Sequence, residues 1–191
     1  MKRILHIFIL VLSLIFAVES AYSQNTNKVA ISNVLISKNS QNISLAFDIK
    51  GAFTKEIEDA IKSGIPTPFT FIVELYRERS FWFNEKLAEL KFKHIVQYDT
   101  LKAEYELIIE EKAAQDKIIK LKDLPQVKEV MSKVEGISVS ISETPQKGSK
   151  YILKIKAKLD TVNLFFPLNY MLFFVSFWDF ETDWHEEIIV Y

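Results

Sequence analysis

The sequence predicts an α+β fold in which about seven antiparallel strands form a β-sandwich or a strongly curved sheet, covered by two amphipathic helices. The first observation behind this prediction is that apolar and polar residues alternate through most of the chain, which is the period of a half-buried strand. The second is that two short segments have helical spacing instead, each preceded by a capping residue.

The first two strands are predicted at residues 29–37 and 42–50, joined by a short polar loop. In the second strand, Ile43, Leu45 and Phe47 lie on one face and polar residues on the other. The two strands are therefore expected to pair as a hairpin.

The first helix is predicted from about Lys55 to Ser63. Thr54 is its expected N-cap, and Gly64 is its expected C-terminal stop. A third strand follows, in which Phe69, Phe71, Val73 and Leu75 share one face.

The next two strands are predicted to form a hairpin that turns at Asp99 and Thr100, because their apolar positions align across that turn. The register pairs Tyr98 with Leu101 and His94 with Tyr105. Asp-Thr is not a favoured two-residue turn pair, so a longer loop with a shifted register stays open.

A charged connector at residues 110–122 leads to the second helix, with Asp123 as cap, an apolar stripe extending to Val134, and Gly136 closing it. A final hairpin is expected to join strands at residues 137–141 and 150–159. The second of these strands carries a row of outward lysines, interpreted as a solvated face that protects a sheet edge.

Composition excludes several classes of function. The chain has no Cys, which rules out disulfides, thiolate catalysis and Cys-ligated metals. Its net charge of −1 provides no global field for nucleic acid or an acidic membrane, although local patches stay open. The three His residues are far apart, and no cofactor motif is present. We therefore expect no nucleic-acid partner, no cofactor and no metal.

Residues 1–23 have the pattern of a signal peptide. Lys2 and Arg3 precede an apolar run from Ile4 to Val18, and the small residues at positions 21 and 23 fit cleavage after Ser23. An uncleaved N-terminal anchor is the alternative, although the run is short for a membrane span. We expect an exported protein of the bacterial periplasm or cell envelope, with residues 24–191 forming a single globular domain.

The order of several motifs resembles an exported bacterial family known as domain of unknown function 4390. The resemblance covers nearly all of the mature chain and rests on Ser63, Gly64, Ile65, Pro66, Arg77, Arg79, Trp82, Tyr98, Asp99, Leu101, Tyr105, Trp178, Asp179 and Trp184. Phe81 and Trp82 stand where the family pattern leads us to expect paired tryptophans. The resemblance implies an envelope location and an uncharacterised role.

Five residues are candidates for contacting a ligand or partner. Arg77 and Arg79 could clamp an anionic group, because guanidinium groups recognise carboxylate and phosphate in a bidentate way, or they could form salt bridges at a strand end. Both are expected at the solvent-facing end of their strand, near a carboxylate such as Glu74 or Glu78. Trp82, Trp178 and Trp184 complete the set.

The segment at residues 161–178 has no charged residue and many aromatic ones, within a wider aromatic-rich region at 161–184. Pro167 and two Asn residues argue against a membrane span. We expect the segment to fold back over the sheet and to leave some rings exposed. Peripheral membrane contact through residues 161–178 is the alternative.

The sequence favours a non-catalytic binding or assembly module of the cell envelope, whose partner is a protein, a lipid or a glycan. The alternative is a hydrolase or lipid-handling enzyme with a cleft that involves His94, Asp99 or His185. The two hypotheses differ in whether His94 and Asp99 point into one solvent-reaching pocket.

Overall fold

The computed structural model describes residues 28–39, 41–110, 116–141, 144–145, 147–159 and 179–191. The predicted signal peptide at residues 1–23 and the aromatic segment at residues 161–178, including Trp178, lie outside these ranges. The expectations for both segments therefore stay predictions.

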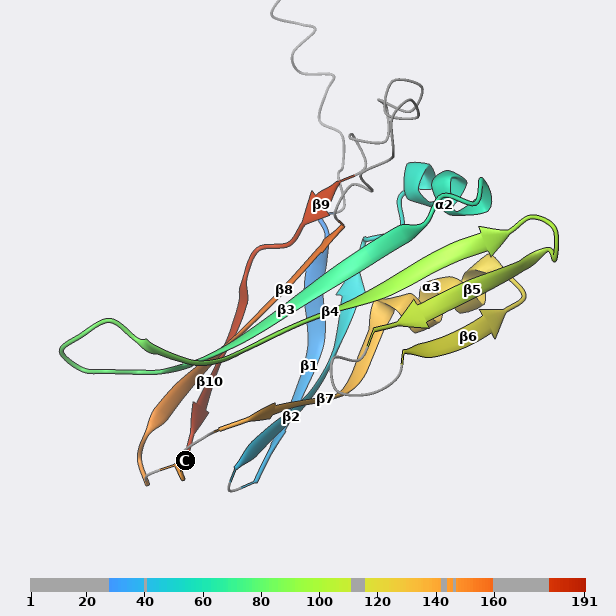
Figure 1. The fold of residues 1–191 in the computed structure, drawn as a ribbon. Helices are drawn as coiled ribbons and strands as arrows, with labels where there is room; N and C mark the ends of the chain where they lie inside the picture. Colours follow the sequence, from blue (N-terminus) through green and yellow to red (C-terminus); the bar gives the residue numbers. More distant parts are fainter. Residues whose placement is uncertain (1–27, 40, 111–115, 142–143, 146, 160–178) are drawn as a thin grey trace, which may run out of the picture.

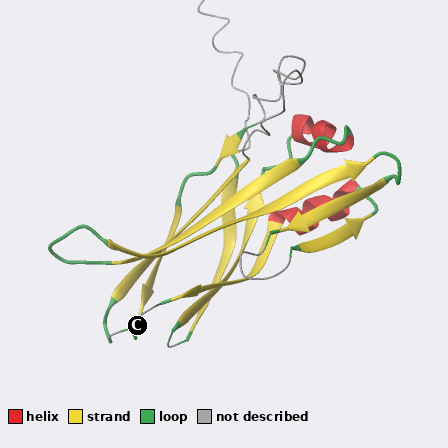
Figure 2. Ribbon diagram, in the orientation of Figure 1, coloured by secondary structure: helices red, strands yellow, loops and turns green. Residues whose placement is uncertain are grey.

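The described residues form two antiparallel sheets and two helices, as the sequence predicted (Figures 1 and 2). The small sheet has the order β1-β2-β7, and its strands are β1 (Ala30–Lys38), β2 (Asn42–Lys50) and β7 (Lys133–Ser140). The large sheet has the order β10-β8-β3-β4-β5-β6, with β9 paired to β8. Its strands are β3 (Thr67–Arg77), β4 (Glu85–Asp99), β5 (Glu104–Ile109), β6 (Lys117–Leu121), β8 (Lys150–Leu159), β9 (Phe180–Glu181) and β10 (His185–Val190).

The core lies between the two sheets. Phe47 of β2 contacts Phe71 of β3, with ring centroids 5.8 Å apart in an edge-to-face arrangement. The apolar face of β3, predicted from its alternation, is completely buried. The sheets therefore form the predicted sandwich, which stays open at its edges.

Helix α2 (Lys55–Lys62) begins and ends where predicted. Thr54 accepts a hydrogen bond from the backbone N–H of Ile57, and Ile57, Ala60 and Ile61 are buried. Helix α3 (Leu124–Ser132) has the predicted cap, because the Asp123 carboxylate accepts from the N–H of Gln126 at 2.9 Å. It packs against both sheets, touching β2 and β7 on one side and β5 and β6 on the other.

The predicted two-residue turn between β4 and β5 is wrong. Tyr98 pairs with Tyr105, and His94 pairs with Ile109, so the register differs by four residues. The Asp99 carboxylate accepts hydrogen bonds from the N–H groups of Leu101 and Lys102, which builds a four-residue loop. The shift is an even number, so the predicted inward face is unchanged.

The predicted end of the second helix is also wrong. Helix α3 ends at Ser132 and runs directly into β7, where Val134 pairs with Phe47 of the small sheet. Gly136 has a φ of +72° and lies in a bulge of β7, where the register with β2 shifts. A glycine at positive φ is common to helix ends and to such bulges, which explains the error.

The predicted final hairpin does not exist, because β7 pairs with β2 and β8 pairs with β3 and β10. Strand β8 is therefore an interior strand, and its lysines do not protect an edge. They form ion pairs across the neighbouring strands instead, as between Lys154 and Glu186 at 2.6 Å. Strand β6 lies within the predicted charged connector, and β9 and β10 were not predicted.

Candidate functional site

The most exposed aromatic group of the described chain lies on the loop between β3 and β4. This loop, residues 78–84, projects from the end of the sheet, away from both helices (Figure 1). Its base is anchored, because Arg77 is paired with Glu85 on one side and with Tyr151 of β8 on the other. The N–H of Glu78 also donates to the carbonyl of Lys150 at 2.9 Å.

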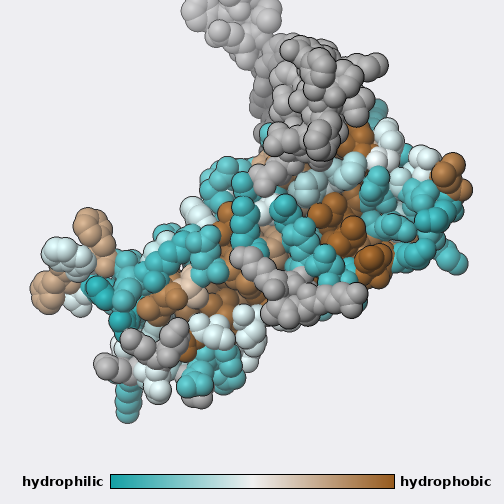
Figure 3. Space-filling model, viewed as in Figure 1, coloured by the Kyte–Doolittle hydropathy of each residue, from teal (hydrophilic) through white to brown (hydrophobic). Residues whose placement is uncertain are grey.

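Three consecutive rings, which we call the aromatic tip, occupy the end of this loop. Phe81 is 98% exposed, Trp82 is 75% exposed and Phe83 is 86% exposed. Figure 3 shows apolar atoms at the far end of this projection, beyond a hydrophilic stretch. Of the other exposed large hydrophobic side chains, Ile188 and Val190 share β10, and the rest, such as Leu35 and Ile118, lie on separate strands or loops.

The base of the loop carries a charged cluster, the arginine neck, formed by Arg77, Arg79 and Glu85. The Arg77 Nε donates to Glu85 Oε2 at 3.1 Å, and Arg79 forms an ion pair with the same oxygen. The hydrogen bond from Arg77, and to a smaller extent the one from Arg79, holds the pKa of the Glu85 carboxyl below its usual range. Both arginines therefore lie at the exposed strand end with a carboxylate, as predicted.

The carboxylate that pairs with the two arginines is Glu85, and not Glu74 or Glu78 as the sequence suggested. Glu74 forms an ion pair with Lys86 at 2.6 Å, and Glu78 forms one with Lys150 at 3.6 Å. Thus the structure brings Arg77, Arg79 and Trp82 together in one hairpin, and their role as ligand contacts stays a prediction.

Trp184 lies elsewhere. It is 37% exposed between β9 and β10, and Lys156 of β8 lies over its ring at 5.0 Å from the centroid. The loop after β3 contacts Lys150, at the other end of β8. Because each strand residue rises about 3.3 Å, Lys150 lies about 20 Å from Lys156, and the loop is therefore distant from Trp184. Trp184 and Trp82 therefore do not share a surface.

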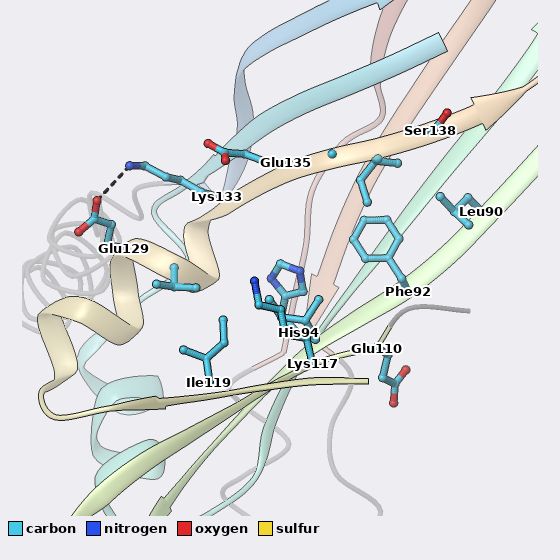
Figure 4. A pocket seen from close by; sticks show the side chains of 14 residues that line it. Leu90, Phe92, His94, Glu110, Lys117, Ile119, Glu129, Lys133, Glu135 and Ser138 are labelled. Carbon is cyan, nitrogen blue, oxygen red and sulfur yellow. Dashed lines mark hydrogen bonds and ion pairs between the residues drawn. The ribbon is translucent and has the colours of Figure 1, made fainter. Parts of the chain in front are cut away.

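A groove of about 620 Å³ opens between the two sheets beside α3 (Figure 4). It has an apolar floor and a charged rim. Its lining includes Phe92, His94, Ile109, Lys117, Ile119 and Ile137.

His94 points into this groove from β4 (Figure 4). It is 4% exposed, and its ring lies 4.9 Å from that of Phe71. Burial lowers the pKa of His94 to about 4, which a backbone hydrogen bond at Met131 only partly opposes. The imidazole is therefore neutral at pH 7, and its Nδ1 has no hydrogen-bond partner among the described residues. His94 does not lie beside Tyr105, whose ring contacts that of Tyr98 instead, with centroids 4.7 Å apart.

The three residues of the predicted enzymatic cleft are not brought together. Asp99 lies at the β4–β5 loop, where an ion pair with Lys102 at 2.9 Å holds its pKa low. His185 lies on β10, which β8 and β3 separate from β4 in the large sheet, and its Nε2 lies 2.9 Å from Glu187. Neither residue lines the groove that contains His94.

Within the described residues, no cluster of three or more His, Asp or Glu side chains could hold a metal ion. No described helix is both long and apolar enough to cross a membrane.

Sequence reasoning selected Trp82 but not Phe81 and Phe83 as contact residues. The signal was present, because the three rings are consecutive and interrupt the strand alternation between Arg79 and Glu85. The groove was not predicted, because it combines residues from β4, β5, β6, α3 and β7.

The comparisons with known proteins identify a family. The model of a family described as Domain of unknown function (DUF4390) matches residues 26–187. The chain belongs to this family. No curated protein and no solved structure matches the chain.

Proposed function

We propose that this member of the DUF4390 family is an exported, non-catalytic binding or assembly module of the bacterial cell envelope, and that the aromatic tip is its contact surface. The observation that carries the proposal is the exposure of Phe81, Trp82 and Phe83 at the end of an anchored hairpin. The pattern of residues 1–23 supports export.

The size of the exposed aromatic surface supports a binding role. Three aromatic side chains present roughly 450–750 Å² of surface. Monomeric proteins seldom expose contiguous apolar patches much larger than a few hundred Å², and such patches mark interaction sites. Aromatic side chains are also enriched among the residues that dominate binding energy at interfaces.

The fold does not need the aromatic tip for its core. Leu75, the last fully buried residue of β3, precedes the loop, and neither Phe81 nor Trp82 contacts the buried cluster. Substitutions at the tip should therefore change binding and leave folding intact. This separation makes the proposal testable by mutation.

The test is affinity capture from an envelope extract with the purified chain as bait. A variant with Phe81→Ser, Trp82→Ser and Phe83→Ser should lose the captured partner and keep its circular dichroism spectrum and melting temperature. Leu101→Ser is the matched control, because Leu101 is 95% exposed at the loop of another hairpin. Equal capture by the triple variant and the wild type would reject the aromatic tip as the contact surface.

Export is tested separately by N-terminal sequencing of the protein recovered from fractionated cells. Cleavage after Ser23 leaves Gln24 as the first residue. An intact Met1 on the exported protein, or recovery from the cytosol alone, would contradict this part of the proposal.

A further inference from the structure

The loop that carries the aromatic tip changes abruptly from charged to uncharged. Residues 80–84 carry no charge, and ionised side chains begin at Arg79 on one side and Glu85 on the other. The aromatic tip thus extends beyond the last charged groups of the hairpin. An apolar end of this kind enters a bilayer interface without taking a charge into the hydrocarbon.

The rings of the tip do not form a flat face. Trp82 and Phe83 lie with centroids 6.4 Å apart and ring planes at 80° to each other, and all three side chains of the tip are exposed. A protein pocket would have to surround the loop on several sides to bury them. A fluid lipid interface covers rings of any orientation, and indole rings favour its boundary of apolar and wet layers.

The arginine neck places two guanidinium groups immediately behind the tip. Arg77 and Arg79 both pair with Glu85, and their side chains are 30% and 43% exposed. Arginine binds phosphate oxygens through its guanidinium fork, so the neck suits a layer of lipid phosphates.

From these three observations we propose that the aromatic tip inserts into the interface of a phospholipid bilayer, with the arginine neck at the level of the lipid phosphates. The inference rests on the proposed function and names the partner of the same surface. It differs from membrane contact through residues 161–178, because those residues take no part in it.

The first test follows Trp82 alone. Trp178→Phe and Trp184→Phe leave Trp82 as the only tryptophan of the purified chain. On addition of vesicles made of phosphatidylcholine and about 30% phosphatidylglycerol, the fluorescence emission of Trp82 should shift to the blue, and brominated acyl chains should quench it. An unshifted, unquenched Trp82 in the presence of vesicle-bound protein overturns the proposal.

The second test measures vesicle binding by co-sedimentation. Trp82→Ser should weaken binding about tenfold, and the triple substitution of the tip about a hundredfold, because each ring contributes its own burial. Arg79→Gln should weaken binding to anionic vesicles about fivefold and leave binding to pure phosphatidylcholine unchanged. This variant keeps the Arg77–Glu85 pair at the base of the loop. Leu101→Ser is again the control and should bind as the wild type does.

The outcomes separate the inference from the function on which it rests. If tip variants lose a protein captured from extract while Trp82 remains unaffected by vesicles, the surface binds a protein and the membrane inference is wrong. If tip variants bind vesicles and extract proteins as well as the wild type does, both proposals are wrong. Vesicle binding that is unchanged by tip substitution would also overturn the membrane inference.

Discussion

His94→Leu should remove part of the acid sensitivity of the fold. The pKa of His94 is about 4 in the folded chain, because the ring is buried against Phe71 and Phe92, and about 6.5 in the unfolded chain. Between these values the unfolded state binds more protons than the folded state. Stability is therefore complete above about pH 6.5 and decreases as the pH falls to about 4. The difference of 2.5 pKa units corresponds to about 3 kcal/mol.

The assay is denaturant unfolding of wild type and variant at several pH values from 7.5 to 4, followed by circular dichroism. Carboxylates that titrate in this range affect both proteins, so the informative quantity is the difference between the two curves. At pH 7.5 the substitution should lower the free energy of unfolding by about 1–3 kcal/mol, because Leu has a similar volume but cannot make the hydrogen bond of His94 with the backbone of Met131. Parallel curves for the two proteins would refute the buried, neutral imidazole.

Three further predictions concern stability and are measured by the same unfolding assay. Phe71→Ala should cost about 3–5 kcal/mol, because it leaves a cavity where β2 and β3 meet at Phe47, and a cost below about 1 kcal/mol would contradict that contact. Gly136→Ala should lower the free energy of unfolding by about 1–2 kcal/mol, because the new side chain is strained at positive φ. Gly64→Ala should lower it further, because its new Cβ would also lie 3.2 Å from the Tyr98 carbonyl oxygen. A larger loss of stability for Gly136→Ala than for Gly64→Ala would be evidence against this geometry. Asp123→Ala should cost about 1 kcal/mol through the lost cap of α3, and Asp123→Asn should restore most of it.

Local signals in the sequence predicted local structure correctly. Thr54 and Asp123 begin the two helices because a short oxygen-bearing side chain satisfies a free backbone N–H wherever the rest of the chain goes. The alternation in β2, β3 and β8 likewise indicated the buried faces, because burial of one face depends only on the period. The fold class follows from these two kinds of signal.

Strand pairing could not be predicted in the same way. Residues 137–140 have the pattern of a strand, but the pattern does not distinguish β2 from β8 as the partner. The β4–β5 register had the same weakness, because every even shift preserves the inward face. Only the Asp99 contacts and the positive φ of Ala103 define the longer loop, and neither is a strong sequence signal.

The candidate site could be predicted where it is local and not where it is assembled. The arginines and Trp82 lie within six positions of each other, so one hairpin brings them together irrespective of the remaining topology. The groove at His94 depends on β7 crossing to the small sheet and on β6 extending the large one. Both features were missed, and the groove was missed with them.

The exposure of the aromatic tip is also an energetic argument for its use. Burial of a side chain such as Phe contributes about 1.5–3 kcal/mol, so three exposed rings leave about 5–9 kcal/mol of stabilisation unrealised. That is comparable with the net stability of a whole domain. The loop holding them continues from β3, which is hydrogen-bonded on both sides as far as Arg77. The rings are therefore held away from the core by a strand that is itself firmly anchored. A partner that buries them recovers free energy that the fold leaves unused, and tip substitutions should consequently weaken binding while the midpoint of unfolding stays unchanged.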